Sequence, residues 1–258
     1  MQLILNEYNY ILNIIDTCIV PKDLSKSYLI NMLGKYYFTY IKEEEIIVNT
    51  IKTQMKKFDF SILEYQEYKW IGKIRKSVKD IIDNDLKLRN LKYVPLYESE
   101  FKMIDTYCET DKEKKLLFVM YILARFYSSN GWINTEIKNI FKYANISTTT
   151  DKQDELLKTL LDKKLISCSK RSDNLNLRID LSNGINDDVV FEVSKFDNLG
   201  NQYLGKFKEG YKQCEECEKV FKAKSKTRPP KYCNKCSVKI NELNVKKAKK
   251  KYYISKKE

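Results

Sequence analysis

Four of the seven cysteines form two closely spaced pairs near the end of the chain, Cys214 with Cys217 and Cys233 with Cys236. Two residues separate the members of each pair, and fifteen residues lie between the pairs. A Cys-x2-Cys pair lets two thiolates reach one ion from a tight backbone turn, and two such pairs complete a tetrahedral shell. The spacing therefore predicts one structural Zn²⁺ bound by four thiolates, with no coordination position left for catalysis.

Two disulfides are the alternative use of the same four thiols. Disulfides persist in oxidising compartments. Residues 1–7 lack the basic segment and the small-residue cleavage site of a secretory signal. No run approaches the roughly 18 apolar residues that span a bilayer. We therefore expect a cytoplasmic chain without a membrane partner, in which the four cysteines hold zinc.

Residues 221–232, which lie between the two cysteine pairs, form a basic loop. It carries five cationic residues, Lys222, Lys224, Lys226, Arg228 and Lys231. A helix-compatible run follows Cys236 as far as about Tyr253. A turn with two cysteines, a basic hairpin and a helix are typical of a treble-clef or zinc-ribbon module. A segment this short buries too little apolar surface to fold alone, so zinc would supply folding free energy on the order of 10 kcal/mol.

Positive charge is concentrated in the same part of the chain. Residues 206–258 hold 18 Lys and Arg against 6 Asp and Glu, a net charge of +12, whereas residues 1–205 hold 30 against 29. Such a local excess predicts an electrostatic footprint for phosphate. The end of the chain adds a run of lysines to it, Lys246, Lys247, Lys249, Lys250 and Lys251. A solubilising tail stays open as the alternative.

The sequence contains no histidine. This absence excludes Ser-His-Asp and Cys-His nucleophile systems, His-ligated zinc sites and HExxH metalloproteases. Residues 200–207 come close to a phosphate-binding P-loop, but Phe207 stands where that loop needs a Ser or Thr hydroxyl for magnesium. We therefore expect no catalytic residues and no enzyme activity.

Residues 111–180 contain helical and extended patterns in a recognisable order. Apolar residues recur at helical spacing over 111–128, and a second helix begins after Asn134 or Thr135. A third helix runs from Thr150, which forms a capping box with Gln153, to about Lys164. Residues 132–133 form a short extended segment and residues 166–180 a hairpin. This order is that of a winged-helix domain, whose third helix commonly enters the DNA major groove.

Two groups of charges bear on whether this domain binds DNA. The hairpin turn carries Lys170 and Arg171, which we expect to contact the nucleic-acid backbone. The third helix has the opposite sign at its start, where Asp151, Asp154 and Glu155 would face phosphate. A winged helix that serves as a scaffold or protein-docking unit is therefore an equal alternative, because a fold by itself does not define a function.

Three regions follow from these patterns in a mainly helical, α+β chain. Residues 1–110 form an N-terminal helical region, with helices near 3–16, 25–41, 43–58 and 62–83. Residues 111–205 form the winged-helix-like domain with a following strand, and residues 206–258 form the basic four-cysteine zinc finger with its lysine-rich tail. We expect the other cysteines and several helical aromatic residues in the core, namely Cys18, Cys108, Cys168, Tyr40 and Tyr68.

Several segments resemble uncharacterised proteins that phages and mobile elements of low-GC Gram-positive bacteria carry. The resemblance covers roughly residues 60–240 and rests on residues 130–136, 141–146 and 174–178 and on the second cysteine pair within 231–236. It implies a bacterial host cytoplasm, a winged-helix-like domain and a C-terminal four-cysteine zinc finger. Only the four zinc ligands carry over, because that family has no assigned catalytic residues to transfer.

Together these features predict a nucleic-acid-binding protein that regulates transcription or replication, with DNA favoured over RNA as its ligand. The alternative is a protein-interaction factor that binds a host machine and inhibits or redirects it. RNA polymerase and a nucleic-acid-guided defence complex such as CRISPR-Cas are the machines we consider. The sequence leaves the oligomeric state open.

Overall fold

The computed structural model describes residues 3–58, 67–128, 130–169, 176–223 and 230–255, and for Glu67 and residues 249–255 it describes the backbone alone. Five of the predicted phosphate contacts lie outside these ranges, namely Lys170, Arg171, Lys224, Lys226 and Arg228. The chain divides into two compact units, Met1–Tyr93 and Val94–Glu258. Among the helices of the described ranges, none combines the length and the apolar composition needed to cross a bilayer.

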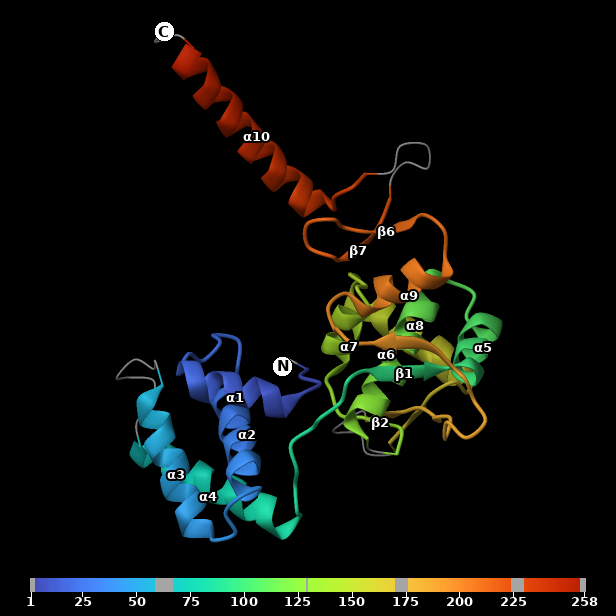
Figure 1. Ribbon diagram of the computed structural model, residues 1–258. Helices are drawn as coiled ribbons and strands as arrows, with labels where there is room; N and C mark the ends of the chain where they lie inside the picture. Colours follow the sequence, from blue (N-terminus) through green and yellow to red (C-terminus); the bar gives the residue numbers. More distant parts are fainter. Residues whose placement is uncertain (1–2, 59–66, 129, 170–175, 224–229, 256–258) are drawn as a thin grey trace. The chain divides into compact units, whose positions relative to one another are not determined.

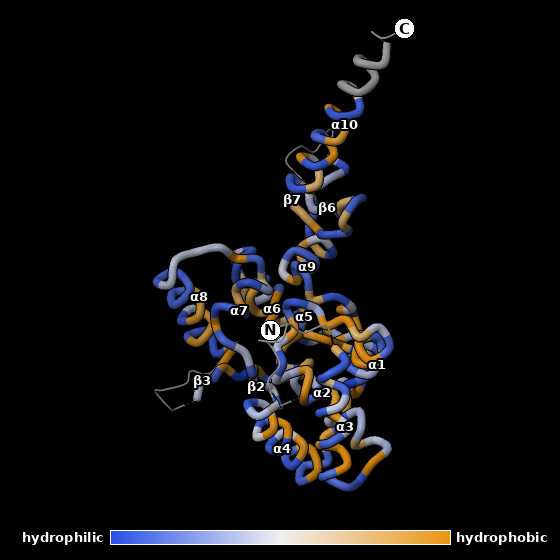
Figure 2. Tube along the Cα trace, turned by 90° about the vertical axis from the view of Figure 1, so that its left-hand side faces the viewer, coloured by the Kyte–Doolittle hydropathy of each residue, from blue (hydrophilic) through white to orange (hydrophobic). Residues whose placement is uncertain are grey.

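The first unit contains four helices, α1 (Glu7–Thr17), α2 (Lys26–Phe38), α3 (Glu44–Lys57) and α4 (Glu67–Asp83) (Figure 1). Hydrophobic residues recur along each of them (Figure 2). These residues meet in one core, in which Ile11, Leu33 and Ile51 are fully buried, and α2 packs against both α3 and α4. The four helices expected from the apolar period are confirmed.

A buried carboxylate ties the first unit together. Glu7, in the first turn of α1, is only 1% exposed. It accepts hydrogen bonds from the Tyr28 hydroxyl at 2.7 Å and from the Arg89 backbone N–H at 2.8 Å. It also pairs with the Lys35 ammonium at 3.4 Å. A buried charge is stable only when it is paired and hydrogen-bonded, so these contacts fix α1 to α2 and to the segment after α4.

Helix α6 (Asp111–Tyr127) forms the centre of the second unit. Residues 116–124 are all buried, which is the pattern of a helix enclosed on every side. Its neighbours include α5 (Glu98–Tyr107), α9 (Leu199–Phe207) and strand β1 (Val94–Tyr97). β1 pairs antiparallel with β5 (Val189–Val193), and Leu96 lies opposite Phe191.

The compact units divide at Tyr93 rather than at residue 110, the boundary expected from the sequence. Residues 94–97 pair with residues 189–193, and α5 packs against α6. Residues 94–110 therefore belong to the second unit, because their partners lie far along the chain. No division falls at residue 205 either, since the hairpin that follows packs against α9.

Residues 132–178 add two helices and a small sheet to the second unit. The elements are β2 (Trp132–Ile133), α7 (Ile137–Tyr143), α8 (Thr150–Asp162), β3 (Ser167–Cys168) and β4 (Leu177–Arg178). The strands form one sheet in the order β2–β4–β3, in which Ile133 and Cys168 both lie opposite Leu177. Gly131 turns the chain into β2 with a φ of 85°, and a β-carbon there would lie 2.0 Å from the Ile179 carbonyl oxygen.

The predicted capping box of α8 is wrong. The N-cap of the helix is Thr149, one residue before the expected position, and its side chain makes no cap hydrogen bond. The Gln153 amide instead donates to the Thr148 carbonyl oxygen at 3.4 Å. Three consecutive threonines offer the helix several starting points, and local sequence alone did not distinguish them.

Three side chains expected in the core are exposed. Tyr40 and Tyr68 are 62% and 73% exposed. Cys168 is exposed on β3, one of the two edge strands of its sheet, whereas Cys108 is buried as expected. An apolar period tells which residues share a face of a helix or strand, but it does not tell whether another element covers that face.

Candidate metal centre

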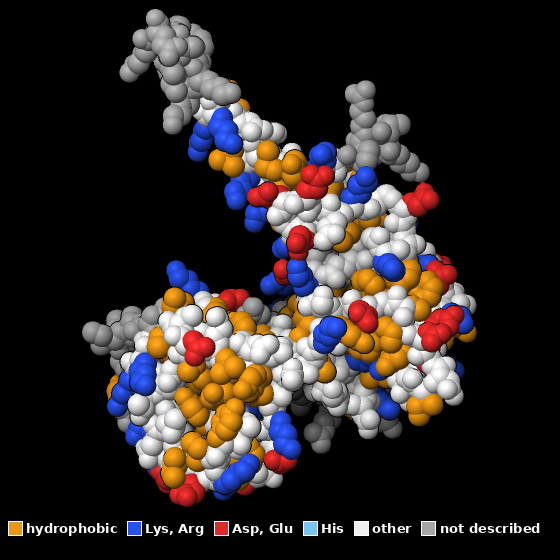
Figure 3. Space-filling model, in the orientation of Figure 1, with side chains coloured by type: hydrophobic (Ala, Val, Ile, Leu, Met, Phe, Trp, Pro, Cys, Tyr) orange, Lys and Arg blue, Asp and Glu red, His pale blue; other side chains and the backbone are white. Residues whose placement is uncertain are grey.

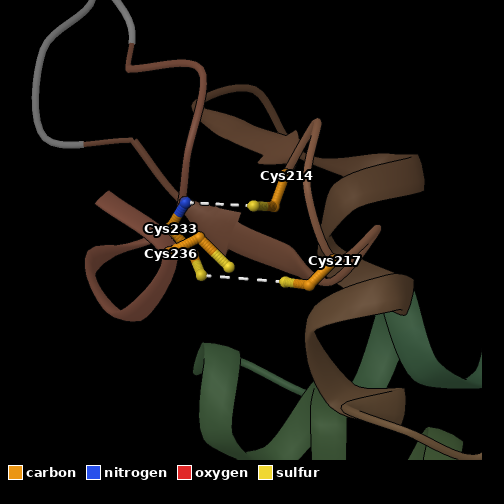
Figure 4. A group of neighbouring side chains, drawn as sticks. All are labelled: Cys214, Cys217, Cys233 and Cys236. Atoms are coloured by element: carbon orange, nitrogen blue, oxygen red, sulfur yellow. Dashed lines mark hydrogen bonds between the residues drawn. The ribbon is translucent and has the colours of Figure 1, made fainter. Parts of the chain in front are cut away.

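The cysteines of the two pairs, Cys214, Cys217, Cys233 and Cys236, come together at the C-terminal hairpin (Figure 4). Their four Sγ atoms all lie within 4.8 Å of one another. Strand β6 (Tyr211–Gln213) ends directly before the first cysteine, and the turn to β7 (Val220–Lys222) carries the second. Helix α10 (Asn234–Ser255) begins between the third and the fourth. The predicted four-cysteine group is thus confirmed as a site able to hold a metal ion.

Backbone hydrogen bonds of the hairpin turn aim the first pair of thiols. The Cys214 N–H donates to the Lys219 carbonyl oxygen at 3.0 Å, and the Glu218 N–H donates to the Cys214 carbonyl oxygen at 2.9 Å. Glu218 has a left-handed φ of 58°, which turns the chain back toward β7. The Cys233 N–H donates to Cys214 Sγ at 3.3 Å and so joins the second pair to the first (Figure 4).

The dimensions of the cluster fit a metal site and not a pair of disulfides. All four cysteines are free thiols. Cys217 Sγ and Cys233 Sγ lie 3.8 Å apart, far beyond the roughly 2.05 Å of a disulfide bond. Four Zn–S bonds of about 2.3 Å, arranged as a tetrahedron, place neighbouring sulfurs about 3.8 Å apart. The donor set and its spacing therefore fit one four-coordinate ion.

The thiols of the cluster differ in acidity. Burial opposes the charged form of Cys214, but hydrogen bonds from the backbone N–H groups of Cys233, Cys217 and Glu216 outweigh it and lower its pKa to about 6. Hydrogen bonds to Cys217 and the other cysteines, together with burial, raise the pKa of Cys236 to about 12. Neighbouring thiolates repel one another, and a divalent cation removes that repulsion. Thiolates favour Zn²⁺ and similar soft or borderline ions over Mg²⁺ and Ca²⁺.

The hairpin that carries the cysteines is docked on α9. The side-chain amides of Asn198 and Asn201 both donate to the Val220 carbonyl oxygen, the second at 3.3 Å. Gly205 permits this close approach, because a β-carbon there would lie 2.6 Å from Val220 Cγ1. The candidate metal centre is therefore a part of the second unit and not a separate domain.

The predicted phosphate contacts that the structure describes lie on the hairpin, in the segment just before α10 and on α10 itself. Lys222 is exposed on β7, and Lys231 is exposed 3.7 Å from the Glu215 carboxylate. Lys246 and Lys247 are exposed on α10. The backbone of the same helix includes the remaining tail lysines, whose side chains lie outside the described part, Lys249, Lys250 and Lys251. The cysteine cluster thus joins two of the basic segments that the sequence singled out.

A cleft of about 500 Å³ beside the metal centre was not expected from the sequence. It lies between α9 and the β6–β7 hairpin, and Cys217 is among the residues that line it. Four lysines also line it, Lys195 from the segment before α9, Lys206 from α9, and Lys212 and Lys219 from the hairpin. The one sequence signal for this site was the excess of lysine after residue 205, which does not show which lysines face the same cavity.

No protein-family model matches the sequence, and neither the curated proteins nor the solved structures gave a match. The class of the protein therefore rests on its own fold and site. It is a mainly helical protein with small sheets and a C-terminal four-cysteine cluster able to hold a metal ion.

Proposed function

We propose that this chain is a zinc-dependent nucleic-acid-binding protein that acts in the regulation of transcription or replication. One observation carries the proposal: the four-cysteine cluster fixes the start of α10, a lysine-rich helix of 22 residues, to a hairpin with the exposed Lys222. Zinc would organise this basic surface and take no part in chemistry, because four thiolates leave no open coordination position.

The exposure of α10 favours a polyanionic partner over a solubilising role. All eight residues from 241 to 248 are exposed, including Leu243 at 48% and Val245 at 53%. Lysines and apolar side chains both lie along the described part of the helix (Figure 3). Like charges three or four residues apart destabilise a helix, and Lys246 and Lys247 are followed by three further lysines. Phosphate groups of a nucleic acid would neutralise these lysines and stabilise the helix.

The domain around α7 and α8 supports a winged-helix-like arrangement in a different role. Two helices, a short first strand and a hairpin in the sheet order β2–β4–β3 are typical of that domain. However, Asp151, Asp154 and Glu155 are exposed on α8 and form no ion pair within the described residues. This face would bring negative charge against phosphate, so we propose that α8 stays outside the groove and that the zinc finger makes the contacts.

The same acidic face of α8 favours a second candidate function. Unpaired carboxylates on one exposed helix suit a basic protein surface better than a nucleic acid. The candidate is a factor that binds a host machine, such as RNA polymerase or a CRISPR-Cas complex, and inhibits or redirects it. Charge reversal at Asp151, Asp154 and Glu155 would abolish that function, whereas charge reversal of the α10 lysines would abolish nucleic-acid binding.

Fluorescence anisotropy of the zinc-loaded full-length protein tests the first function. Labelled duplex DNA, single-stranded DNA and RNA are titrated at several salt concentrations. A fourfold substitution to Gln removes the four predicted phosphate contacts of the module whose side chains the structure describes, Lys222, Lys231, Lys246 and Lys247. We expect weaker binding, and on duplex DNA a log–log salt slope that falls by about 0.9 for each lost phosphate contact.

A matched control removes the same number of charges from the first unit. The substitutions to Gln are placed at four exposed lysines, Lys22, Lys76, Lys79 and Lys92. This variant should bind like the unaltered protein. An equal loss in both variants would mean that net charge alone drives binding. If the unaltered protein binds no nucleic acid above a micromolar background, the proposal fails, and capture of RNA polymerase by the chain becomes the experiment for the second candidate.

A further inference from the structure

Three free lysines converge on the cleft between α9 and the β6–β7 hairpin. Lys206, Lys212 and Lys219 line it, are exposed, and form no ion pair within the described part of the chain. Lys195 also lines the cleft, but its ammonium pairs with the Glu218 carboxylate at 2.6 Å. Three unpaired cations from two elements around one cavity of about 500 Å³ favour an anionic ligand.

Two aromatic rings give the same cleft a second kind of contact. Tyr211 is half-buried at the cleft and makes no ring contact with any other described residue. Phe191 also lines the cleft, and its ring is held in the core 5.7 Å from the ring of Phe118. An unstacked tyrosine beside free lysines offers one surface for a flat ring and another for phosphate.

The polar residues of the cleft indicate which part takes the phosphate. The Gln202 amide group donates to the carbonyl oxygens of Lys195 at 3.0 Å and Asp197 at 2.6 Å, which leaves its own oxygen as an acceptor. The Asp197 carboxylate lines the same part and forms no ion pair among the described residues. A phosphate is repelled there and attracted by the three free lysines. The acceptors are suited to the amino groups of a base.

We propose that this cleft binds one unpaired nucleotide, with its base against Tyr211 and its phosphate among Lys206, Lys212 and Lys219. The inference rests on the proposed nucleic-acid binding and specifies the ligand as single-stranded. Bases inside a duplex are stacked on both sides and cannot enter a cavity, whereas unpaired bases turn outward and stack on protein rings. An acidic peptide would satisfy the lysines, but its carboxylates have no flat ring to place on Tyr211.

The test compares two substitutions at Tyr211 in the zinc-loaded full-length protein. Tyr211→Ala removes the ring, and Tyr211→Phe keeps it. We expect Tyr211→Ala to weaken binding of a single-stranded oligonucleotide about tenfold, with Tyr211→Phe close to the unaltered protein. Binding of a duplex of equal length should not change in either variant. Equal affinities of the two variants for the single strand would overturn the proposal, as would an equal loss on the duplex.

The lysines supply a test that does not disturb the hairpin, because all three side chains are exposed. A triple substitution to Gln at Lys206, Lys212 and Lys219 should lower the salt slope on single strands by about 0.7 for each lost phosphate contact. The control makes the same change at Lys22, Lys76 and Lys79. An unchanged slope contradicts the inference, and so does competition by a poly-glutamate peptide at equal charge concentration.

These outcomes separate the inference from the proposed function. If binding of both the single strand and the duplex is weakened by the fourfold substitution at Lys222, Lys231, Lys246 and Lys247 but not by the substitutions in the cleft, the cleft proposal is wrong and nucleic-acid binding stands. If the unaltered protein binds neither ligand, both are wrong. Zinc content measured on every variant shows whether the hairpin has kept its metal.

Discussion

Gly205 on α9 and Val220 on β7 are in such close contact that a β-carbon on residue 205 would lie 2.6 Å from a methyl carbon of Val220. Asn198, the N-cap of α9, and Asn201 in its first turn both donate a side-chain hydrogen bond to the carbonyl oxygen of the same valine. Val220 is thus one of the residues through which the hairpin of the metal centre packs against the rest of the second unit. The orientation of the cysteine cluster depends on that packing, and so does the cleft beside it.

Gly205→Ala should therefore destabilise the second unit. Alanine is favoured over glycine in a helix by about 0.5–1 kcal/mol, but overpacking against Val220 costs about 1–3 kcal/mol. Combined with Val220→Ala, the same change should become neutral or stabilising. Gly72→Ala on α4 is the control, because nothing lies within 4 Å of its β-carbon, and it should stabilise by about 0.5–1 kcal/mol. Urea unfolding measures the free energy of unfolding of each variant. If the effects of Gly205→Ala and Val220→Ala simply add in the double variant, residue 205 does not clash with Val220 and the prediction is wrong.

Removal of the metal should unfold the C-terminal hairpin while the rest of the second unit stays folded. The four thiols are the main link between the hairpin and α10, whereas the core around α6 is apolar and needs no metal. Elemental analysis should find one Zn²⁺ per chain, and Cys217→Ser should lower that content. Amide hydrogen exchange after chelation should increase in residues 211–240 only. Cys168→Ser is the control, since this cysteine is exposed and lies outside the cluster.

Glu113 should make the second unit sensitive to acid. Its carboxylate is 7% exposed and binds the Lys163 ammonium at 3.0 Å and the Thr110 hydroxyl at 2.9 Å. Burial opposes the charged form, but these hydrogen bonds and that of the Glu109 N–H lower its pKa below the ordinary value. A lowered pKa in the folded state means that the stabilisation is complete above about pH 5 and is lost as pH falls through the folded pKa.

The substitution Glu113→Gln tests this pH dependence. It should cost about 1–3 kcal/mol at pH 7, because the amide cannot serve as a charged acceptor for Lys163. The difference from the unaltered protein should shrink as the pH is lowered below about 4, where the carboxylate itself becomes protonated. Chemical unfolding of both proteins at several pH values from 7 to below about 4 measures this difference in the free energy of unfolding. A difference that is the same at every pH would show that Glu113 acts through packing and not through its charge.

Loss of the buried Glu7 should unfold the first unit without affecting the second. Glu7→Ala leaves the partners of a buried charge uncompensated, which costs about 3–5 kcal/mol. The two tryptophans report separately, Trp70 from the first unit and Trp132 from the second. We expect the unfolding midpoint to fall for Trp70 fluorescence only. Glu45→Ala breaks the exposed pair with Arg75 and should cost less than about 1 kcal/mol. Equal shifts at both tryptophans would mean that the units unfold as one.

Local regularities in the sequence predicted much of the fold. The helices of the first unit follow from the apolar period, and the order of elements over residues 111–180 follows from periodicity and turn residues. The starting residue of α8 was missed, because Thr148, Thr149 and Thr150 are chemically equivalent candidates. Errors of this kind arise where neighbouring residues compete for the same local role.

The sequence by itself determined the four-cysteine site, because each pair is positioned by a turn of a few residues and the two pairs need only one ion between them. Only the tertiary structure decided which surfaces are covered. It placed residues 94–110 with β5 in the second unit, left the acidic face of α8 exposed, and gathered Lys206, Lys212 and Lys219 around one cleft. Each of these three outcomes depends on contacts between residues that are distant in the chain. Periodicity and spacing show which residues of one segment share a face, but not which other segment packs against that face.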